Sequence, residues 1–243
     1  MMYYGDPLAD GVVGTQPKKG THWAYQYGSM SVVLEGERLA VAMTPIVKGG
    51  QSRALHVRRL LGKASELGIK VKLVLLDAGH FSVDVINYLK SSGLKFIMRM
   101  PNIGIARAGD DFIYTTTSHR RPNNWQATFR VVAMNGRDGV GHRKLFIFAT
   151  NTDLKARRIG KLFRKRWAIE TSYRMINQFL PKTAFKAYSV RRLYFYLTVL
   201  MCNSWVMVNY GRARVIVERV RLMIVITIIF WASMPWMTSG NPR

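Results

Sequence analysis

The chain has 243 residues, among them 37 Lys or Arg and 13 Asp or Glu, which gives a net charge of +24. The basic excess runs along the whole chain and 49% of the residues are hydrophobic, so the composition provides for a buried core and excludes a disordered basic tail. A field of this sign attracts polyanions, which favours a nucleic-acid partner and leaves an anionic membrane surface as the competing one.

The cysteine count and the hydropathy pattern narrow the class of protein further. Cys202 is the single cysteine, so the chain has no disulfide framework and no thiolate zinc site, as in a reducing cytoplasm. Residues 1–20 lack the apolar core of a signal peptide. The apolar run Leu222–Met237 is shorter than the ~20 residues of a spanning helix and is interrupted by Pro235. We therefore expect buried amphipathic helices there and in Leu193–Asn209, and no membrane span.

The first elements alternate between strand and helix patterns. Two β-rich runs, Thr21–Leu34 and Arg38–Val47, predict a hairpin whose turn holds Glu35, Gly36 and Glu37. Gln51–Leu67 has the spacing of an amphipathic helix. The next run, Ile69–Leu76, becomes continuously apolar, which is typical of a central strand, and it ends at Asp77.

The secondary-structure pattern changes twice in the rest of the chain. A helix at Ser82–Ser91 and a strand at Lys95–Met100 precede a β-rich stretch, and helical patterns begin near Leu154. The expected strands of the β-rich stretch are Asp111–Thr117, Ala127–Met134 and Lys144–Thr150, with turns at Asn135–Gly136 and Asp138–Gly139; the expected later helices end at Phe179, span Val190–Tyr210 and span Ala213–Trp231. This order predicts an α/β core, 1–100 and 153–243, with a β-rich insertion at 101–152.

The carboxylates are few enough to assign one by one. Most have routine surface roles: Asp110 and Asp111 in a turn, Asp153 as a helix N-cap, and Asp84 in the first turn of a helix. Asp77 is different, because it ends an apolar strand, where open α/β sheets place ligands. The alternative for Asp77 is a helix cap or a structural ion pair.

The second exceptional acid is Glu170, alone in the most basic segment, Lys161–Asn177. Phe163, Arg166, Glu170 and Asn177 stand at i, i+3, i+7 and i+14, so that they share one helix face. Glu170 is either paired with Arg166 or Arg174, or it is a metal ligand beside a nucleic-acid backbone. Together with Asp77 on so basic a chain, it favours a site for Mg²⁺ or Mn²⁺ in phosphoryl transfer.

Other side chains add weaker indications. His80 is a general base or metal ligand beside Asp77, or an ordinary hydrogen-bonded loop histidine. Five aromatic residues could stack on bases, and of these only Trp167 adjoins a basic cluster; they are Trp23, Tyr25, Tyr27, Trp125 and Trp167. The chain has neither the HExxH pattern of a zinc protease nor a phosphate-binding GxxxxGK[ST] loop.

Two of these segments resemble a known family. One branch of the DDE transposases of prokaryotic insertion sequences, the branch like insertion sequence four, carries a Tyr–Arg–Glu–Lys signature. The spacing of Phe163, Arg166, Glu170 and Asn177 is similar to that signature. Arg and Glu match, Phe replaces Tyr, and Asn replaces Lys. The surrounding FRKRWAIETSYRMINQFLPKT looks like an archaeal version of that helix. LLDAGHFS resembles the strand-end aspartate segment of the same family, from which Ala78 and His80 depart.

The resemblance implies an RNase H-like fold: a mixed sheet flanked by helices, with a β-rich insertion before the last catalytic helix. It also implies DNA strand cleavage and transfer by three carboxylates with two Mg²⁺ or Mn²⁺ ions. Asp77 would be the second ligand and Glu170 the third, with Arg166 orienting Glu170 or contacting DNA. The expected DNA-binding residues are Lys161, Arg164, Lys165, Trp167, Arg174 and Asn177. The implied partners are double-stranded DNA of the transposon ends and target and a second copy of the chain, with no membrane, in a nucleoid-associated cytoplasmic protein.

The first family aspartate has no counterpart. It belongs on a first core strand just before a segment that resembles Tyr3–Tyr4–Gly5–Asp6, so we expect a truncated or mis-started transposase that lacks this strand and is impaired. Three alternatives remain open: a non-catalytic basic nucleic-acid-binding protein, another RNase H-like nuclease, and a membrane-surface protein that uses Leu193–Trp231.

Overall fold

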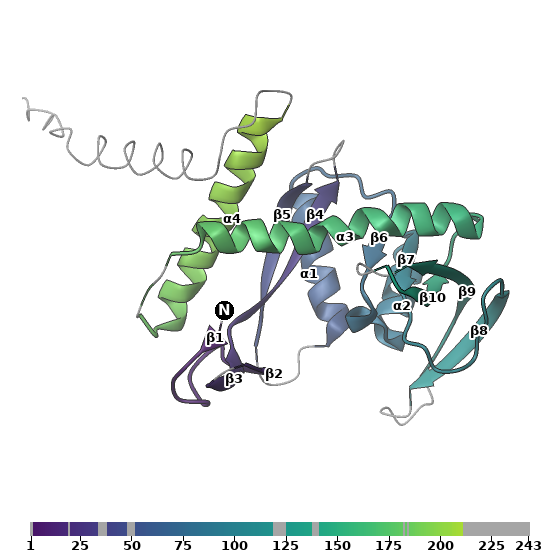
Figure 1. Cartoon of the computed structure of the whole chain (residues 1–243), viewed down its shortest axis with the longest axis horizontal. Coiled ribbons are helices and arrows are strands. Elements are labelled where there is room, and N and C mark those ends of the chain that lie inside the picture. The colour runs from purple at the N-terminus through teal and green to yellow at the C-terminus, as the bar shows by residue number, and fades with distance from the viewer. Residues whose placement is uncertain are drawn as a thin grey trace, which may run out of the picture. The chain divides into compact units, whose positions relative to one another are not determined.

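The computed structural model describes residues 2–18, 20–33, 38–47, 52–118, 125–137, 141–181, 183 and 185–210 (Figure 1). The chain divides into two units, the first formed by Met1–Val32 with Ala40–Glu170 and the second by Val33–Leu39 with Thr171–Arg243.

The N-terminal strands form two small sheets. β1 (Met2–Tyr3), β3 (Thr21–Ala24) and β2 (Val13–Lys18) form one antiparallel sheet, and β4 (Gln26–Val33) and β5 (Arg38–Ile46) form the predicted hairpin. The single strand expected at Thr21–Leu34 is wrong, because the structure divides it at Tyr25. This side chain is only 1% exposed and its ring packs edge-on against Tyr3, with the centroids 5.1 Å apart.

A five-stranded mixed sheet carries most of the first unit. Its order is β6 (Val74–Leu76), β7 (Phe96–Arg99), β10 (Arg143–Thr150), β9 (Trp125–Arg137) and β8 (Asp111–Ser118). β6 and β7 are parallel and the other pairs are antiparallel. The mixed sheet is thus confirmed, and it is compatible with an RNase H-like DDE fold.

The strand before Asp77 differs from its prediction. β6 has three residues and lies at the edge of this sheet as described, whereas the apolar run Ile69–Leu76 suggested a longer, central strand. The run is apolar because its side chains pack on both faces: Leu73 and Leu75 join one core cluster, and Val71 and Val74 join the other. Burial on both sides therefore made a short strand look like a long one.

The predicted turn at Asn135–Gly136 is also wrong. Both residues lie within β9, paired with Leu145 and Lys144 of β10. A side-chain carbon at Gly136 would lie 3.0 Å from the ring of Phe146, so the glycine makes room for this ring. Close packing between strands, and not chain reversal, accounts for the glycine here.

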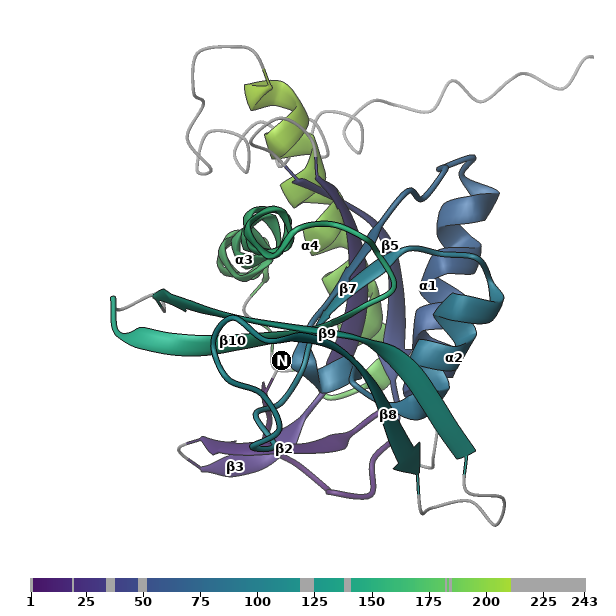
Figure 2. The ribbon, with the colours of Figure 1, turned by 90° about the vertical axis from the view of Figure 1, so that its right-hand side faces the viewer.

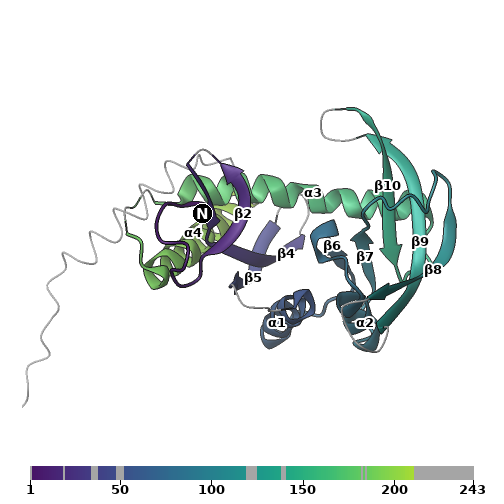
Figure 3. The same cartoon turned by 90° about the horizontal axis from the view of Figure 1, so that it is seen from below.

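Helices cover both faces of the sheet (Figure 3). The predicted helices α1 (Arg53–Glu66) and α2 (Val83–Ser91) are present, and Ser52 and Ser82 cap them by accepting from Leu55 N and Val85 N. Buried residues of α1 and α2 share a core cluster with Leu76 and Met98. On the opposite face α3 (Ala156–Phe179), seen nearly end-on in Figure 2, contributes Ile159 and Phe163 to a second cluster with Ile97.

The segment before α3 is held by an arginine. Arg130 of β9 donates through Nη1 to the carbonyl oxygens of Thr152 and Leu154, at 2.7 and 3.1 Å. Its Nε and Nη2 donate to the Asp111 carboxylate at 2.7 and 2.6 Å. The turn position given to Asp111 is therefore wrong, whereas the expected strand Asp111–Thr117 is confirmed as β8. Asp111 begins this strand and pairs with an arginine that also anchors the approach to α3.

The start of α3 corrects one more prediction. The helix begins at Ala156, so the residue at the cap position is Lys155, whose carbonyl accepts from Arg158 N and Ile159 N. Asp153 lies too far upstream to be the N-cap. Asp84 does lie in the first turn of α2, as expected.

In the second unit the structure describes α4 (Tyr188–Asn209), near the expected Val190–Tyr210. Cys202 is buried in this helix, and burial raises the pKa of its thiol to about 11. Among the described residues no helix is both long enough and apolar enough to cross a membrane. The expected helix Ala213–Trp231 and the apolar run Leu222–Met237 lie outside the described residues.

Candidate active site

Asp77 directly follows β6 and caps the short 3₁₀ helix η1 (Ala78–His80). Its Oδ1 accepts from the backbone N–H of Gly79 at 3.1 Å. Its Oδ2 lies 3.8 Å from Nη1 of Arg166, and the Asp77 side chain is 57% exposed. The cap and the ion pair that were the alternatives for Asp77 are therefore both present, yet the carboxylate remains open to solvent.

Arg166 reaches Asp77 from α3 and is itself well covered, with 12% of its side chain exposed. Its guanidinium carbon lies 5.3 Å from the ring centroid of Phe163. The Phe163 ring packs edge-on against Phe148 of β10, with the centroids 4.9 Å apart. Packing between α3 and the sheet thus holds Arg166 over the strand end.

Glu170 follows Arg166 by four residues in α3, one helical turn further on, so both occupy the same helix face. The side chains of Glu170 and Trp167 lie outside the description. The prediction that Glu170 pairs with Arg166 or binds a metal therefore rests on the position of its backbone in α3.

Arg99, the last residue of β7, was missed by the sequence analysis. Asp77 follows Leu76, whose partner in β7 is Met98, so Asp77 and Arg99 leave neighbouring strands at the same level. Burial lowers the pKa of Arg99, the positive charge of Arg166 lowers it further, and Asp77 opposes both effects. The one signal in the sequence is a basic residue at the end of an otherwise apolar strand, in Phe96–Arg99.

His80 lies at the end of η1, beside Asp77. Burial lowers its pKa, while the charge of Asp77 acts in the opposite direction. Its Nδ1 is buried without a hydrogen-bond partner, and the same holds for Nδ1 of His56 in α1. Burial at this position thus favours the neutral imidazole over the cation.

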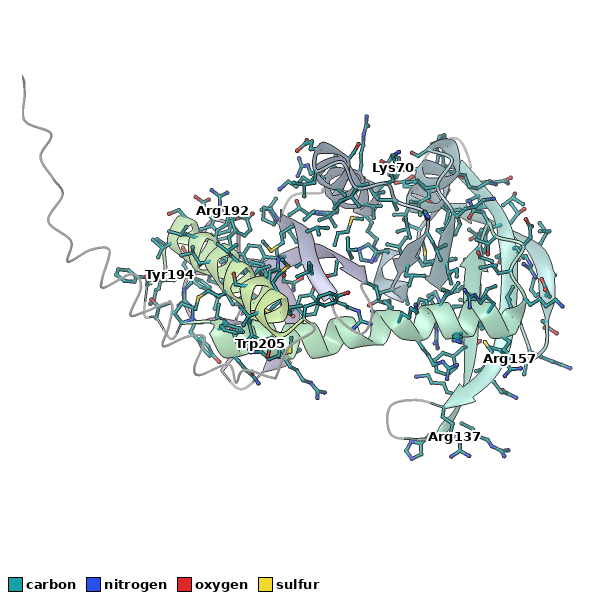
Figure 4. The ribbon with its side chains drawn as sticks, turned by 90° about the horizontal axis from the view of Figure 1, so that it is seen from above. Lys70, Arg137, Arg157, Arg192, Tyr194 and Trp205 are labelled. Carbon is teal, nitrogen blue, oxygen red and sulfur yellow. The ribbon has the colours of Figure 1, made fainter. Side chains whose placement is uncertain are left out.

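A cavity of about 370 Å³ lies between α3 and the facing ends of β9 and β10. Its floor is apolar and includes Met134, Phe146, Phe148 and Phe163. Three cations also line it, and these are Arg137, Arg157 and Arg164, the first two labelled in Figure 4. Since Phe163 also stacks under Arg166, one aromatic ring joins the cavity to the Asp77 side of the site.

The residues predicted to bind DNA are distributed as follows. Lys161, Arg164 and Lys165 are exposed on α3 in the first unit. Arg174 and Asn177 are exposed in the second unit. Of the aromatic candidates, Trp125 is 42% exposed, whereas Tyr25 is buried and the prediction that it stacks on bases is wrong.

The donor set can be compared with what a divalent metal needs. Mg²⁺ and Mn²⁺ prefer carboxylate oxygens, and the exposed Asp77 carboxylate is such a ligand. Within the described part of the chain, no group of three or more His, Cys, Asp or Glu side chains is close enough to form a complete site. Asp77 therefore fits as one ligand, and any further ligand must come from elsewhere, such as Glu170.

A mixed five-stranded sheet with helices on both faces, and an acid at a strand end facing a basic helix, define an α/β protein compatible with the RNase H-like class. The family model described as transposase DDE domain matches residues 12–205. The chain therefore belongs to the DDE transposase family, whose activity is transposition-type DNA cleavage and strand transfer and whose members typically use divalent metal ions. A search of curated proteins finds no match for the chain.

Proposed function

We propose that this chain cleaves and transfers DNA strands at the ends of an insertion sequence, with Asp77 and Glu170 as carboxylates that hold Mg²⁺ or Mn²⁺. The observation that carries the proposal is the position of Asp77: an exposed acid at a strand end, 3.8 Å from an arginine of the basic helix α3. The same helix carries Glu170 one turn further on.

The roles of the chain's own groups follow from their surroundings. Divalent ions, when bound, would polarise the scissile phosphate and lower the pKa of the attacking water or 3′-hydroxyl. Arg166, whose guanidinium lies over the Phe163 ring, would orient the carboxylates and contact a phosphate oxygen. The exposed cations of α3, Lys161, Arg164 and Lys165, would hold the DNA backbone, since lysine and arginine replace its condensed counterions.

We further propose the branch marked by the Tyr–Arg–Glu–Lys signature, in an archaeal form. The burial of Phe163 supports it, because a phenylalanine can take the packing role of the signature tyrosine. Asn177, in the position of the signature lysine, is exposed and neutralises no phosphate. We expect this chain to act slowly, since no third carboxylate joins Asp77 within the described residues.

Metal binding and cleavage test the proposal separately. Titration of the chain with Mn²⁺, followed by electron paramagnetic resonance, should show at least about tenfold weaker binding in Asp77→Asn and in Glu170→Gln. Cleavage of a supercoiled plasmid in Mn²⁺ should be lost in both variants while plasmid binding is retained. If both variants bind Mn²⁺ and cleave as the parent does, the two acids are structural and the proposed site is wrong; if the parent itself binds the plasmid without cleaving it, the chain is a non-catalytic basic DNA-binding protein.

A further inference from the structure

Arg99 stands at the meeting point of the sheet and α3. It follows Ile97 by two residues in β7, so its side chain leaves the sheet on the same face, and Ile97 is buried there against Phe163 and Ile159 of α3. In the antiparallel pairing with β10, its partner is Phe148. Arg99 therefore lies on the same side as Arg166, next to the strand end that bears Asp77.

Two contacts from β10 hold its guanidinium group. Nη2 donates to the carbonyl oxygen of Leu145 at 3.3 Å, and the guanidinium carbon lies 4.2 Å from the ring centroid of Phe146. Stacking of this kind fixes the plane of the group without using its N–H donors. An arginine has five such donors, so after the bond to Leu145 most of them remain for a ligand.

The charges around Arg99 favour an anion. The positive charge of Arg166 is close enough to disfavour that of Arg99, and Asp77 is the anion that acts on Arg99 in the opposite direction. The Arg99 guanidinium is partly covered, and a covered cation is costly unless it is paired. A phosphodiester oxygen pair would satisfy it, because the guanidinium fork matches the phosphodiester in shape and charge.

We propose that Arg99 is a DNA-binding residue of the site, which holds a backbone phosphate beside Asp77 together with Arg166. This inference deepens the function proposed above and rests on it. Arg99 takes this role because β10 fixes its guanidinium in place before DNA binds. The adjoining aromatic ring, Phe146, also lines the cavity of about 370 Å³, so a bound DNA strand would pass next to this cavity.

Salt dependence of DNA binding tests the inference on the full chain. Binding of a short fluorescein-labelled duplex of mixed sequence is measured in Ca²⁺ at several salt concentrations. Arg99→Met keeps an apolar stem of similar size and removes the charge. We expect the slope of log K against log salt to fall by about 0.9, the value for one lost phosphate contact, and the affinity to fall about tenfold or more.

The matched control is Arg58→Met, on the exposed side of α1, the helix that packs on the opposite face of the sheet. It should leave the slope unchanged. If Arg99→Met behaves as Arg58→Met does, with the parent's slope, Arg99 has a packing role and the inference is overturned. If Arg99→Met does not fold, Arg99→Lys replaces it in the test. A salt slope equal to the parent's, with binding about tenfold weaker, supports the contact between the guanidinium fork and a phosphate. An unchanged affinity overturns the inference.

The outcome is separable from that of the proposed function. Binding in Ca²⁺ requires no cleavage, so the slope reports on Arg99 even if the Asp77 and Glu170 variants show no effect on cleavage. If those variants do abolish cleavage while Arg99→Met leaves the slope unchanged, the proposed function stands and the role of Arg99 fails alone.

Discussion

Oδ2 of Asp77 lies 3.8 Å from Nη1 of Arg166, which joins the end of β6 to the middle of α3. The two side chains differ in environment, since Asp77 is 57% exposed and Arg166 only 12%. A pair at this distance with one exposed member adds at most about 1 kcal/mol to the free energy of unfolding. Stability is therefore a weak reason for the pair, which agrees with the binding role proposed for both side chains.

Replacement of Asp77 should separate catalysis from folding. Asp77→Asn keeps an oxygen that can accept from Gly79 N, so the free energy of unfolding should change by less than about 1 kcal/mol. Strand cleavage in Mn²⁺ should fall about a thousandfold, because the proposed metal ligand is lost. Asp84→Asn, in the first turn of α2, is the control and should cleave as the parent does. Equal cleavage by both variants would contradict the assignment.

The shape of the Arg166 side chain should matter as well as its charge. Arg166→Lys retains a cation but loses the planar group that stacks on Phe163. We expect the single-turnover cleavage rate at saturating DNA to fall about tenfold, and the duplex affinity to fall as well, because the fork contact to a phosphate is lost. Arg164→Lys, exposed on the same helix, should leave both quantities nearly unchanged. A loss of affinity without a loss of rate would show that Arg166 only binds DNA.

The contact of α3 with the sheet should depend strongly on Phe163. This side chain is 5% exposed and packs against Phe148, so Phe163→Ala should lower the free energy of unfolding by about 3 kcal/mol or more. Denaturant unfolding followed by far-ultraviolet circular dichroism measures this. Ile113→Ala, at a side chain 68% exposed on β8, should cost less than about 0.5 kcal/mol. Similar losses in the two variants would mean that α3 does not pack as described.

The Asp111–Arg130 pair should give stability a dependence on pH. The hydrogen bonds from Arg130 lower the pKa of Asp111, so its contribution is complete above the unfolded pKa and is lost as the pH falls through the folded one. Asp111→Asn should thus lower the free energy of unfolding by about 1 kcal/mol at pH 7, a small value because Asp111 is 45% exposed.

Thermal melts from about pH 7 to about pH 2 test this, because the difference between Asp111→Asn and the parent should vanish at the acid end of the series. Asp10→Asn, at an exposed position near the N-terminus, should follow the parent curve throughout. A difference that persists at the lowest pH would show that Asp111 acts through packing and not through its charge.

Local patterns determined much of this protein. The helices α1 and α2 follow from apolar spacing and from serine caps, and β8, β9 and β10 follow from β-rich runs, because these signals act between residues a few positions apart. Asp77 and Arg166 could also be identified as candidates, since a strand-end acid and a basic helix are visible in the sequence. The family follows from the match over residues 12–205.

Strand register and packing decided the rest. Arg99 reaches the site because β7 lies between β6 and β10, and Asp111 meets Arg130, 19 residues away, because β8 pairs with β9. Tyr25 is removed from the surface by its contact with Tyr3, and Gly136 lies in a strand because the ring of Phe146 needs its space. The sequence alone thus indicated Asp77, Glu170 and the cations of α3 as candidates for binding metal and DNA, and it gave no sign of the position of Arg99. Tertiary structure decided which of the described ones meet, because such contacts depend on how distant strands align.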